Sequence, residues 1–215
     1  MTGHEYNIAH FSFDEREFSI ENPYLTEISE ILDALKTKKV PNLSVALSEY
    51  RPELITKYAF SIPVMETLEI IAGYSPLVEI GAGTGYWAMC LAEAGAEIEA
   101  FDIKPPDENT PYDWFDTNYW FGDTWYTVGE GDESMAAACP EMALFLSWPM
   151  PESPMAYNAL QHYKGAGGHT VIYIGDARSS GDERFHDELL SLTIVENRRI
   201  WSWPGVEERL IIGKC

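Results

Sequence analysis

The stretch LVEIGAGTG at residues 77–85, followed by EIEAFD at residues 97–102, decides the fold of this 215-residue chain. The first four residues predict a short buried strand. The three glycines after it predict a tight turn into a helix over 86–94, which Gly95 ends. A second strand with an acidic end follows at 97–102. This order predicts two parallel strands joined by a right-handed crossover through the helix.

The same alternation of strands and helices continues to the end of the chain. We expect further strands over 125–128, 142–147, 169–174, 192–200 and 209–212, and helices over 133–139, 155–163 and 185–190. The pattern predicts one α/β domain with a Rossmann-like, seven-stranded, mostly parallel sheet that is covered by helices on both faces.

The residues before the first strand predict a helical extension. We expect helices from Asn22-Pro23 to about residue 39, near 43–50, and from Ser61 to Gly73, preceded by a polar tail or lid strand over residues 1–20. Asn22 is a capping residue, and proline suits the first turn of a helix. Residues 1–75 are therefore expected to form an extension or lid, and residues 76–215 the core of the same domain.

The composition excludes several classes of partner. The chain has 14 Lys and Arg against 35 Asp and Glu, a formal net charge of −21. Such a surface repels nucleic acid and anionic membranes, so we expect a small-molecule partner. The charge by itself is better explained by a role in solubility, and the alternative is a preference for neutral or cationic small molecules.

The cysteines and the apolar runs suggest a location. Three scattered cysteines, without metal-ligand spacing, predict no metal site and suit a reducing compartment. No signal-peptide pattern begins the chain, and no run of about 20 apolar residues is present. We expect a cytoplasmic protein.

The glycine-rich turn points to a nucleotide-like cofactor. Glycines between a strand and a helix let the backbone approach a ligand closely, and Asp102 ends the next strand, where a carboxylate can accept both hydroxyls of a ribose. The dinucleotide fingerprint GxGxxG is not complete, because Tyr86 occupies the position of its third glycine. Together these features predict an adenosine-containing cofactor.

The order of an acidic residue followed by GxGxG resembles the first motif of class I S-adenosylmethionine-dependent methyltransferases. The resemblance implies S-adenosyl-L-methionine as cofactor, with Gly81, Gly83 and Gly85 lining its methionine half. Glu79 would organise the loop or bind the cofactor's amino group, and Asp102 would bind the ribose.

Two later positions extend the resemblance. Asp132, after the third expected strand, is similar to the family's adenine-binding acid, although it is equally suited to capping the next helix. Ser147-Trp148-Pro149-Met150 resembles in part the Asn/Asp/Ser-Pro-Pro-Tyr/Phe motif of amino-group methyltransferases. Trp148 is inserted and Met150 replaces the aromatic residue, so N-methylation does not follow. Ser147 and Trp148 are candidate catalytic residues, or else a turn that ends a strand.

A wider resemblance covers about residues 55–213. It is to an uncharacterised group of bacterial class I methyltransferase-like proteins, and it is carried by residues 58–63, 77–88, 144–149, 169–177 and 203–205. It makes Tyr58 a candidate to close over the methionine end of the cofactor. A packing role for Tyr58 is the alternative.

The aromatic segment 112–126 is the candidate acceptor enclosure, with Trp114, Trp120 and Trp125 as substrate-binding residues. Aromatic faces attract cations, and the aspartates interleaved with these rings would also favour an amine. The alternative is that these rings pack a long insertion against the sheet. We nominate none of the histidines as a general base.

The predicted function is methyl transfer to a nitrogen or oxygen nucleophile of a small molecule. One alternative is a protein of the same fold that binds S-adenosylmethionine without methylating, in a regulatory role. Another is a different reaction of the same cofactor, since a fold does not fix the chemistry. An NAD-dependent oxidoreductase is disfavoured by the missing third glycine and by the lack of a Tyr-x-x-x-Lys pair.

Overall fold

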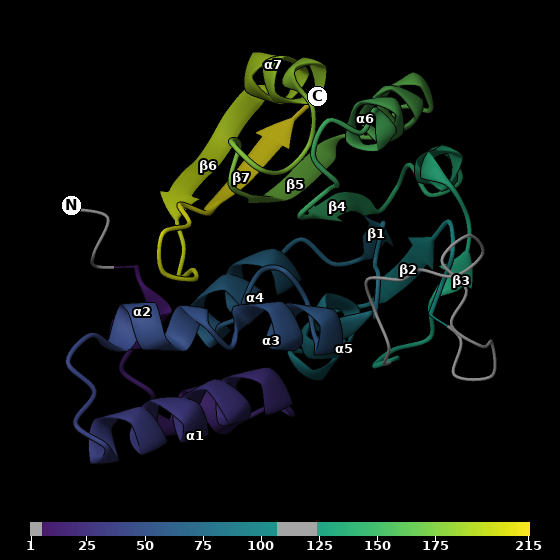
Figure 1. Cartoon of the computed structure of the whole chain (residues 1–215). Coiled ribbons are helices and arrows are strands. Elements are labelled where there is room, and N and C mark those ends of the chain that lie inside the picture. Colours follow the sequence, from purple (N-terminus) through teal and green to yellow (C-terminus); the bar gives the residue numbers. More distant parts are fainter. Residues whose placement is uncertain (1–5, 107–123) are drawn as a thin grey trace.

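A computed structural model describes residues 6–106 and 124–215 (Figure 1). Within these residues seven strands form one sheet, in the order β3-β2-β1-β4-β5-β7-β6. Strands β1 to β5 are parallel, and β7 runs antiparallel to both β5 and β6. This is the Rossmann order with an antiparallel strand between the last two, so the predicted fold class is confirmed. The strands are β1 (Leu77–Ile80), β2 (Ile98–Asp102), β3 (Gly129–Glu130), β4 (Ala143–Ser147), β5 (Thr170–Gly175), β6 (Thr193–Arg199) and β7 (Arg209–Lys214).

Alternate residues of the strands pack on different helical layers. One face packs against α1 (Pro23–Thr37), α4 (Met65–Ala72) and α5 (Tyr86–Glu93). The other face packs against α6 (Met155–Gly165) and α7 (Glu183–Ser191). Both faces of the sheet are therefore buried, as parallel strands require.

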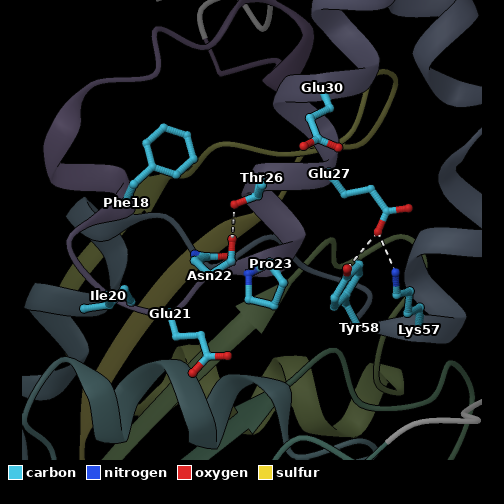
Figure 2. Close-up of a pocket in the computed structure, with 10 residues that line it drawn as sticks. All are labelled: Phe18, Ile20, Glu21, Asn22, Pro23, Thr26, Glu27, Glu30, Lys57 and Tyr58. Carbon is cyan, nitrogen blue, oxygen red and sulfur yellow. Dashed lines mark hydrogen bonds and ion pairs between the residues drawn. The ribbon is translucent and has the colours of Figure 1, made fainter.

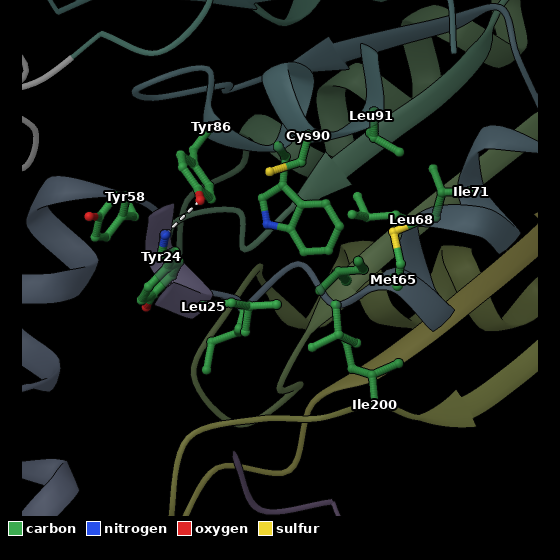
Figure 3. Packing of buried hydrophobic residues seen from close by; sticks show 14 of the residues in the cluster. Tyr24, Leu25, Tyr58, Met65, Leu68, Ile71, Tyr86, Cys90, Leu91 and Ile200 are labelled. Carbon is green, nitrogen blue, oxygen red and sulfur yellow. Dashed lines mark hydrogen bonds between the residues drawn. The ribbon is translucent and has the colours of Figure 1, made fainter. Parts of the chain in front are cut away.

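The first of these layers contains the N-terminal helices (Figure 3). Leu25 of α1 and Leu68 of α4 lie in one buried cluster. Phe145 of β4 belongs to the same cluster. Residues before and after position 75 thus share one hydrophobic core. At the start of α1, the Asn22 side chain accepts a hydrogen bond from the N–H of Leu25 at 3.2 Å, which is the capping that its sequence predicts.

Two helices of this layer differ from the prediction. The structure has an additional helix, α3 (Arg51–Lys57), after α2 (Leu43–Ser48). Only Leu54 of α3 is buried, so its sequence carries little helical periodicity. The predicted start of the next helix at Ser61 was wrong, because Val64 is still extended and α4 begins at Met65.

The expected tail or lid strand over residues 1–20 was wrong for the described residues 6–20. They form two short 3₁₀ helices, η1 (Ile8–His10) and η2 (Glu15–Phe18). Ile8 is fully buried, and its N–H donates to the carbonyl of Ser202 at 2.9 Å. This segment packs against the chain that joins β6 to β7.

The third strand also differs. The expected strand over 125–128 was wrong, because β3 begins at Gly129 and Trp125 instead donates its N–H to the carbonyl of Thr84 at 2.9 Å. The short helix after it is a 3₁₀ helix, η3 (Glu133–Ala137). The remaining predicted strands and helices lie within about two residues of their observed bounds.

Candidate functional site

A cavity of about 770 Å³ lies at the carboxyl ends of β1, β2, β3 and β4. Its centre is the place where β1 and β4 are neighbours, from which the strand order runs outward in both directions. Rossmann-like sheets bind their ligands at this switch point. The volume suits a cofactor or a drug-sized ligand. The lining comprises residues 79–84, 102–104, 131–133, 147–151 and 153–155, with Arg51, residues 58–60, Trp87, Ser179 and Val206.

The glycine loop between β1 and α5 requires its glycines for backbone reasons. Gly81, Gly83 and Gly85 have φ values of 77°, 55° and 74°, which L side chains rarely adopt. A Cβ at Gly85 would also lie 2.9 Å from the Cβ of Tyr126. Gly81 and Gly83 line the cavity, whereas Gly85 is the N-cap of α5 and is not a lining residue.

Asp102 holds this loop in place. Its carboxylate accepts hydrogen bonds from the N–H of Gly83 at 2.9 Å and from the N–H of Lys104 at 3.0 Å. Burial raises the pKa of Asp102, and these two bonds oppose that shift. The cavity therefore contains a buried carboxylate that is fixed by the backbone at the ends of two strands.

Glu79 is the most unusual group of the cavity. It is 1% exposed, and its Oε2 atom has no hydrogen-bond partner among the residues that the structure describes. Burial raises the pKa of Glu79 to about 8, and the negative charge of Asp102 adds to this effect. A buried carboxyl group with a free oxygen is suited to receive a donor, above all a cationic one.

Tyr58 forms a wall between the cavity and a second groove. Its ring stacks between Tyr24, with centroids 4.7 Å apart, and Trp125, at 5.2 Å. Its hydroxyl donates to Oε2 of Glu27 at 2.7 Å, and Lys57 donates to the same oxygen at 2.8 Å (Figure 2). That groove, of about 580 Å³, lies against α1, and Tyr58 lines both spaces.

Asp132 lies on the rim of the cavity, where it is exposed and caps η3. Its Oδ1 accepts from the N–H of Ser134 at 2.9 Å and from the Ser134 hydroxyl. These bonds lower the pKa of Asp132. The expected capping role is thus observed, and the residue also faces the cavity.

Ser147 and Trp148 both line the cavity where β4 ends. Trp148 has a φ of 48°, a strained conformation for a bulky residue. Its N–H donates to the carbonyl of Ile174 at 2.8 Å, and its ring stacks on Phe60 at 5.8 Å. The guanidinium carbon of Arg51 lies 5.8 Å from the centroid of the same ring.

The aromatic residues expected around the acceptor are described only in part. Trp114 and Trp120 lie outside the described residues. Trp125 has a different place from the one expected, since it is not among the lining residues of the cavity. Its Nε1–H donates to the carbonyl of Lys57 at 2.7 Å, and its ring stacks on the ring of Tyr58.

Several residues at the cavity escaped the sequence analysis. Arg51, Phe60 and Trp87 line it, and the indole N–H of Trp87 has no partner among the described residues. Arg51 lies in α3, outside every motif, and Phe60 and Trp87 lie within the stretches 58–63 and 77–88 without a role that those stretches imply. Within the described ranges no cluster of three His, Cys, Asp or Glu residues could hold a metal, and no helix is long and apolar enough to cross a membrane.

No family model matches this chain. The chain is 26% identical over 159 residues to a protein-L-isoaspartate O-methyltransferase of Koribacter versatilis (strain Ellin345), covering 67% of this chain and 68% of that protein.

Solved structures give further similarities. Magnesium protoporphyrin IX methyltransferase from Synechocystis PCC 6803, with bound SAM, has a TM-score of 0.41 at 12% identity. The matched region covers 69% of this chain and 78% of that chain. MtNAS in complex with MTA and tNA has a TM-score of 0.44 at 10% identity. The matched region covers 93% of this chain and 74% of that chain.

The sheet order and the cavity define a Rossmann-like α/β protein with a ligand-sized site at its switch point. The curated relative confirms the resemblance of this chain to the class I S-adenosylmethionine-dependent methyltransferases.

Proposed function

We propose that this protein binds S-adenosyl-L-methionine and transfers its methyl group to a nitrogen or oxygen nucleophile of a small-molecule acceptor. The observation that carries the proposal is one cavity that contains both the glycine loop, fixed by Asp102, and the unpartnered carboxylate oxygen of Glu79. The bound cofactor supplies an activated methyl group, so the protein's part is to position the acceptor and exclude water.

The adenosine half is assigned to Asp102 and Asp132. Each oxygen of Asp102 accepts one backbone N–H and retains capacity for another donor, such as a ribose hydroxyl. Asp132 faces the cavity two strands away from β1, beyond β2. The order of these two acids along the sheet supports a ribose site followed by a base site.

The methionine half is assigned to the loop and to Glu79. Gly81 and Gly83 let the backbone approach the ligand, and Gly85 turns the chain into α5. The free oxygen of Glu79 fits an ammonium group, which is the donor that its environment lacks. Tyr58 closes this end, and Trp125 keeps the Tyr58 ring in place rather than touching the acceptor.

The acceptor is assigned to the side where β4 ends. Ser147 and Trp148 are proposed as the residues nearest the transferred methyl group, and Trp114 and Trp120 as further substrate-binding residues. Among the described histidines none lines the cavity, so the residues there orient a nucleophile rather than supply an imidazole base.

Other parts of the proposal rest on the sequence. Residues 1–75 are proposed as an N-terminal extension or lid, and residues 76–215 as the cofactor-binding core of the same domain. The cytoplasm is the proposed location, because the free thiols of Cys90, Cys139 and Cys215 suit a reducing compartment. With a net charge of −21, nucleic acid is a disfavoured acceptor. The name of the curated relative adds isoaspartyl peptides to the acceptors worth screening.

Calorimetric titration of the purified protein with S-adenosylmethionine, S-adenosylhomocysteine and NADH tests the proposal. We expect micromolar binding of the first two compounds and none of NADH. Incubation with isotope-labelled cofactor and a panel of amines, phenols and carboxylic acids then tests for turnover. Binding without turnover on any acceptor would favour the non-methylating alternative, and no binding of either adenosyl compound would overturn the proposal.

A further inference from the structure

Buried polar atoms without partners lie at and near Arg51, which lines the cavity. Among the described residues, Nε of Arg51 and both carboxylate oxygens of Glu208 have no hydrogen-bond partner. The hydroxyl of Ser61 is near enough to lower the pKa of Glu208, yet it is not in hydrogen-bond geometry with it. Buried polar groups are normally paired, so such a concentration indicates a place prepared for a ligand.

Arg51 is the cation of this group. It is the first residue of α3, it lines the cavity, and within residues 6–106 and 124–215 it forms no ion pair. The positive charge of Arg51 acts to lower the pKa of Glu208, which is fully buried. A guanidinium without a carboxylate partner is unusual in a chain with 35 acidic residues. Its donors are thus available to a group that enters the cavity.

The position of Arg51 separates it from the cofactor's adenosine side. Arg51 lies beside Trp148, whose N–H is bonded to β5, whereas Asp132 follows β3. In the sheet order β3 and β4 are three strand spacings apart, about 14 Å. Arg51 therefore faces the part of the cavity over β4 and β5, where the acceptor is proposed to bind.

The surroundings of Arg51 select one kind of anion. A guanidinium fork matches a carboxylate with two parallel hydrogen bonds. The negative charge of Asp176, which acts on Glu208, adds to the negative potential of these surroundings and favours a singly charged anion over a doubly charged phosphate. The stacked rings of Phe60 and Trp148 offer a flat apolar wall next to the cation.

We propose that Arg51 binds a carboxylate of the methyl acceptor, and that the acceptor is a small carboxylic acid with a flat apolar body packed on Trp148 and Phe60. The inference rests on the proposed function, because it names the substrate class of the same cavity. Arg51 is a specificity-determining residue in this scheme, and the buried carboxyl group of Glu208 nearby leaves the Nε donor of Arg51 without a partner.

The test uses benzoate and its neutral isostere benzamide as probes, titrated into the full-length protein with and without S-adenosylhomocysteine. We expect benzoate to bind at least tenfold more tightly than benzamide. Arg51→Gln should weaken benzoate binding at least tenfold and leave benzamide binding unchanged. Arg51→Lys, which keeps the charge but not the fork, should fall between. Arg16→Gln, at an exposed arginine paired with Glu69, is the matched control and should change neither.

A parallel titration shows whether Arg51 binds a carboxylate of the acceptor or the carboxylate of the cofactor. S-adenosylhomocysteine carries one in its amino-acid end, and 5′-methylthioadenosine does not. If Arg51→Gln weakens S-adenosylhomocysteine tenfold but leaves methylthioadenosine unchanged, Arg51 serves the cofactor and the acceptor assignment is overturned. Equal binding of benzoate and benzamide to a protein that binds S-adenosylhomocysteine overturns this inference alone. Failure to bind S-adenosylhomocysteine overturns the proposed function, and the acceptor role with it.

Discussion

The carboxylate of Asp102 accepts a hydrogen bond from the backbone N–H of Gly83 at 2.9 Å, across 19 positions of sequence. The end of β2 thereby fixes the conformation of the loop that follows β1. In the proposed site the same carboxylate receives the ribose hydroxyls. A single side chain then both shapes the loop and binds the ligand, so its removal acts in two ways.

We predict that Asp102→Ala weakens S-adenosylmethionine binding at least tenfold, about 1.4 kcal/mol. Asp102→Asn should lose less affinity, because the one remaining oxygen can still accept the hydrogen bond from the N–H of Gly83. Calorimetry measures both. Asp187→Ala, at an exposed position on α7, is the matched control and should bind like the wild type. An unchanged affinity of Asp102→Ala would remove Asp102 from the site.

Gly83→Val is predicted to abolish cofactor binding while the fold is retained. At a φ of 55° a β-branched residue is strained, so the loop must move away from the cavity. Far-ultraviolet circular dichroism should be unchanged, and titration should show no binding. Gly165→Val is the control, because its Cβ would meet no atom within 4 Å. Retained binding by the Gly83 variant would mean that the glycine loop does not bind the cofactor.

Cofactor binding near neutral pH should release a proton from Glu79. In the free protein its pKa of about 8 keeps it largely protonated at pH 7, and an ammonium partner would favour the carboxylate. We expect about one proton released per ligand at pH 7, and none above pH 9. Titration in buffers of different ionisation enthalpy measures the release. Glu79→Gln should show none and bind more weakly; an identical release in that variant would assign the proton to another group.

The ring of Tyr58, rather than its hydroxyl, is predicted to matter for the cofactor. The hydroxyl is engaged with Glu27 on the side of the second groove, so Tyr58→Phe should keep the affinity for S-adenosylmethionine. Its free energy of unfolding should fall by about 1 kcal/mol through the lost hydrogen bond. Tyr58→Ala should weaken binding at least tenfold. Equal losses in both variants would point to the hydroxyl instead.

Glu208 is predicted to make the protein less stable as the pH rises. Burial raises its pKa from the ordinary 4.5 to about 8. Between these values the native state holds a proton that the unfolded state has lost, so the free energy of unfolding decreases with increasing pH by up to about 1.4 kcal/mol per unit. Glu208→Gln should remove this part of the slope between pH 5 and 8. Chemical denaturation across that range measures it, and parallel slopes would contradict the prediction.

The sequence was sufficient for the local parts of the fold and of the site. Short-range rules cover the glycine turn at 81–85, the Asn22 cap and the alternation of strands and helices, and all of these are observed. Helix α3 and the 3₁₀ segments at 6–20 were missed, because each buries only a few residues and thus carries weak periodicity.

By itself, then, the sequence determined the Rossmann-like fold and the glycine loop, since both depend on backbone freedom and on hydrophobic patterning along the chain. Only the tertiary structure decided that Trp125 supports Tyr58 instead of lining the cavity. It also decided that Arg51, which lies beside Trp148, acts electrostatically on Glu208, 157 positions away, without forming an ion pair with it. The reason is physical: contacts between distant segments follow from how the helical layer packs on the sheet, and no local spacing records them.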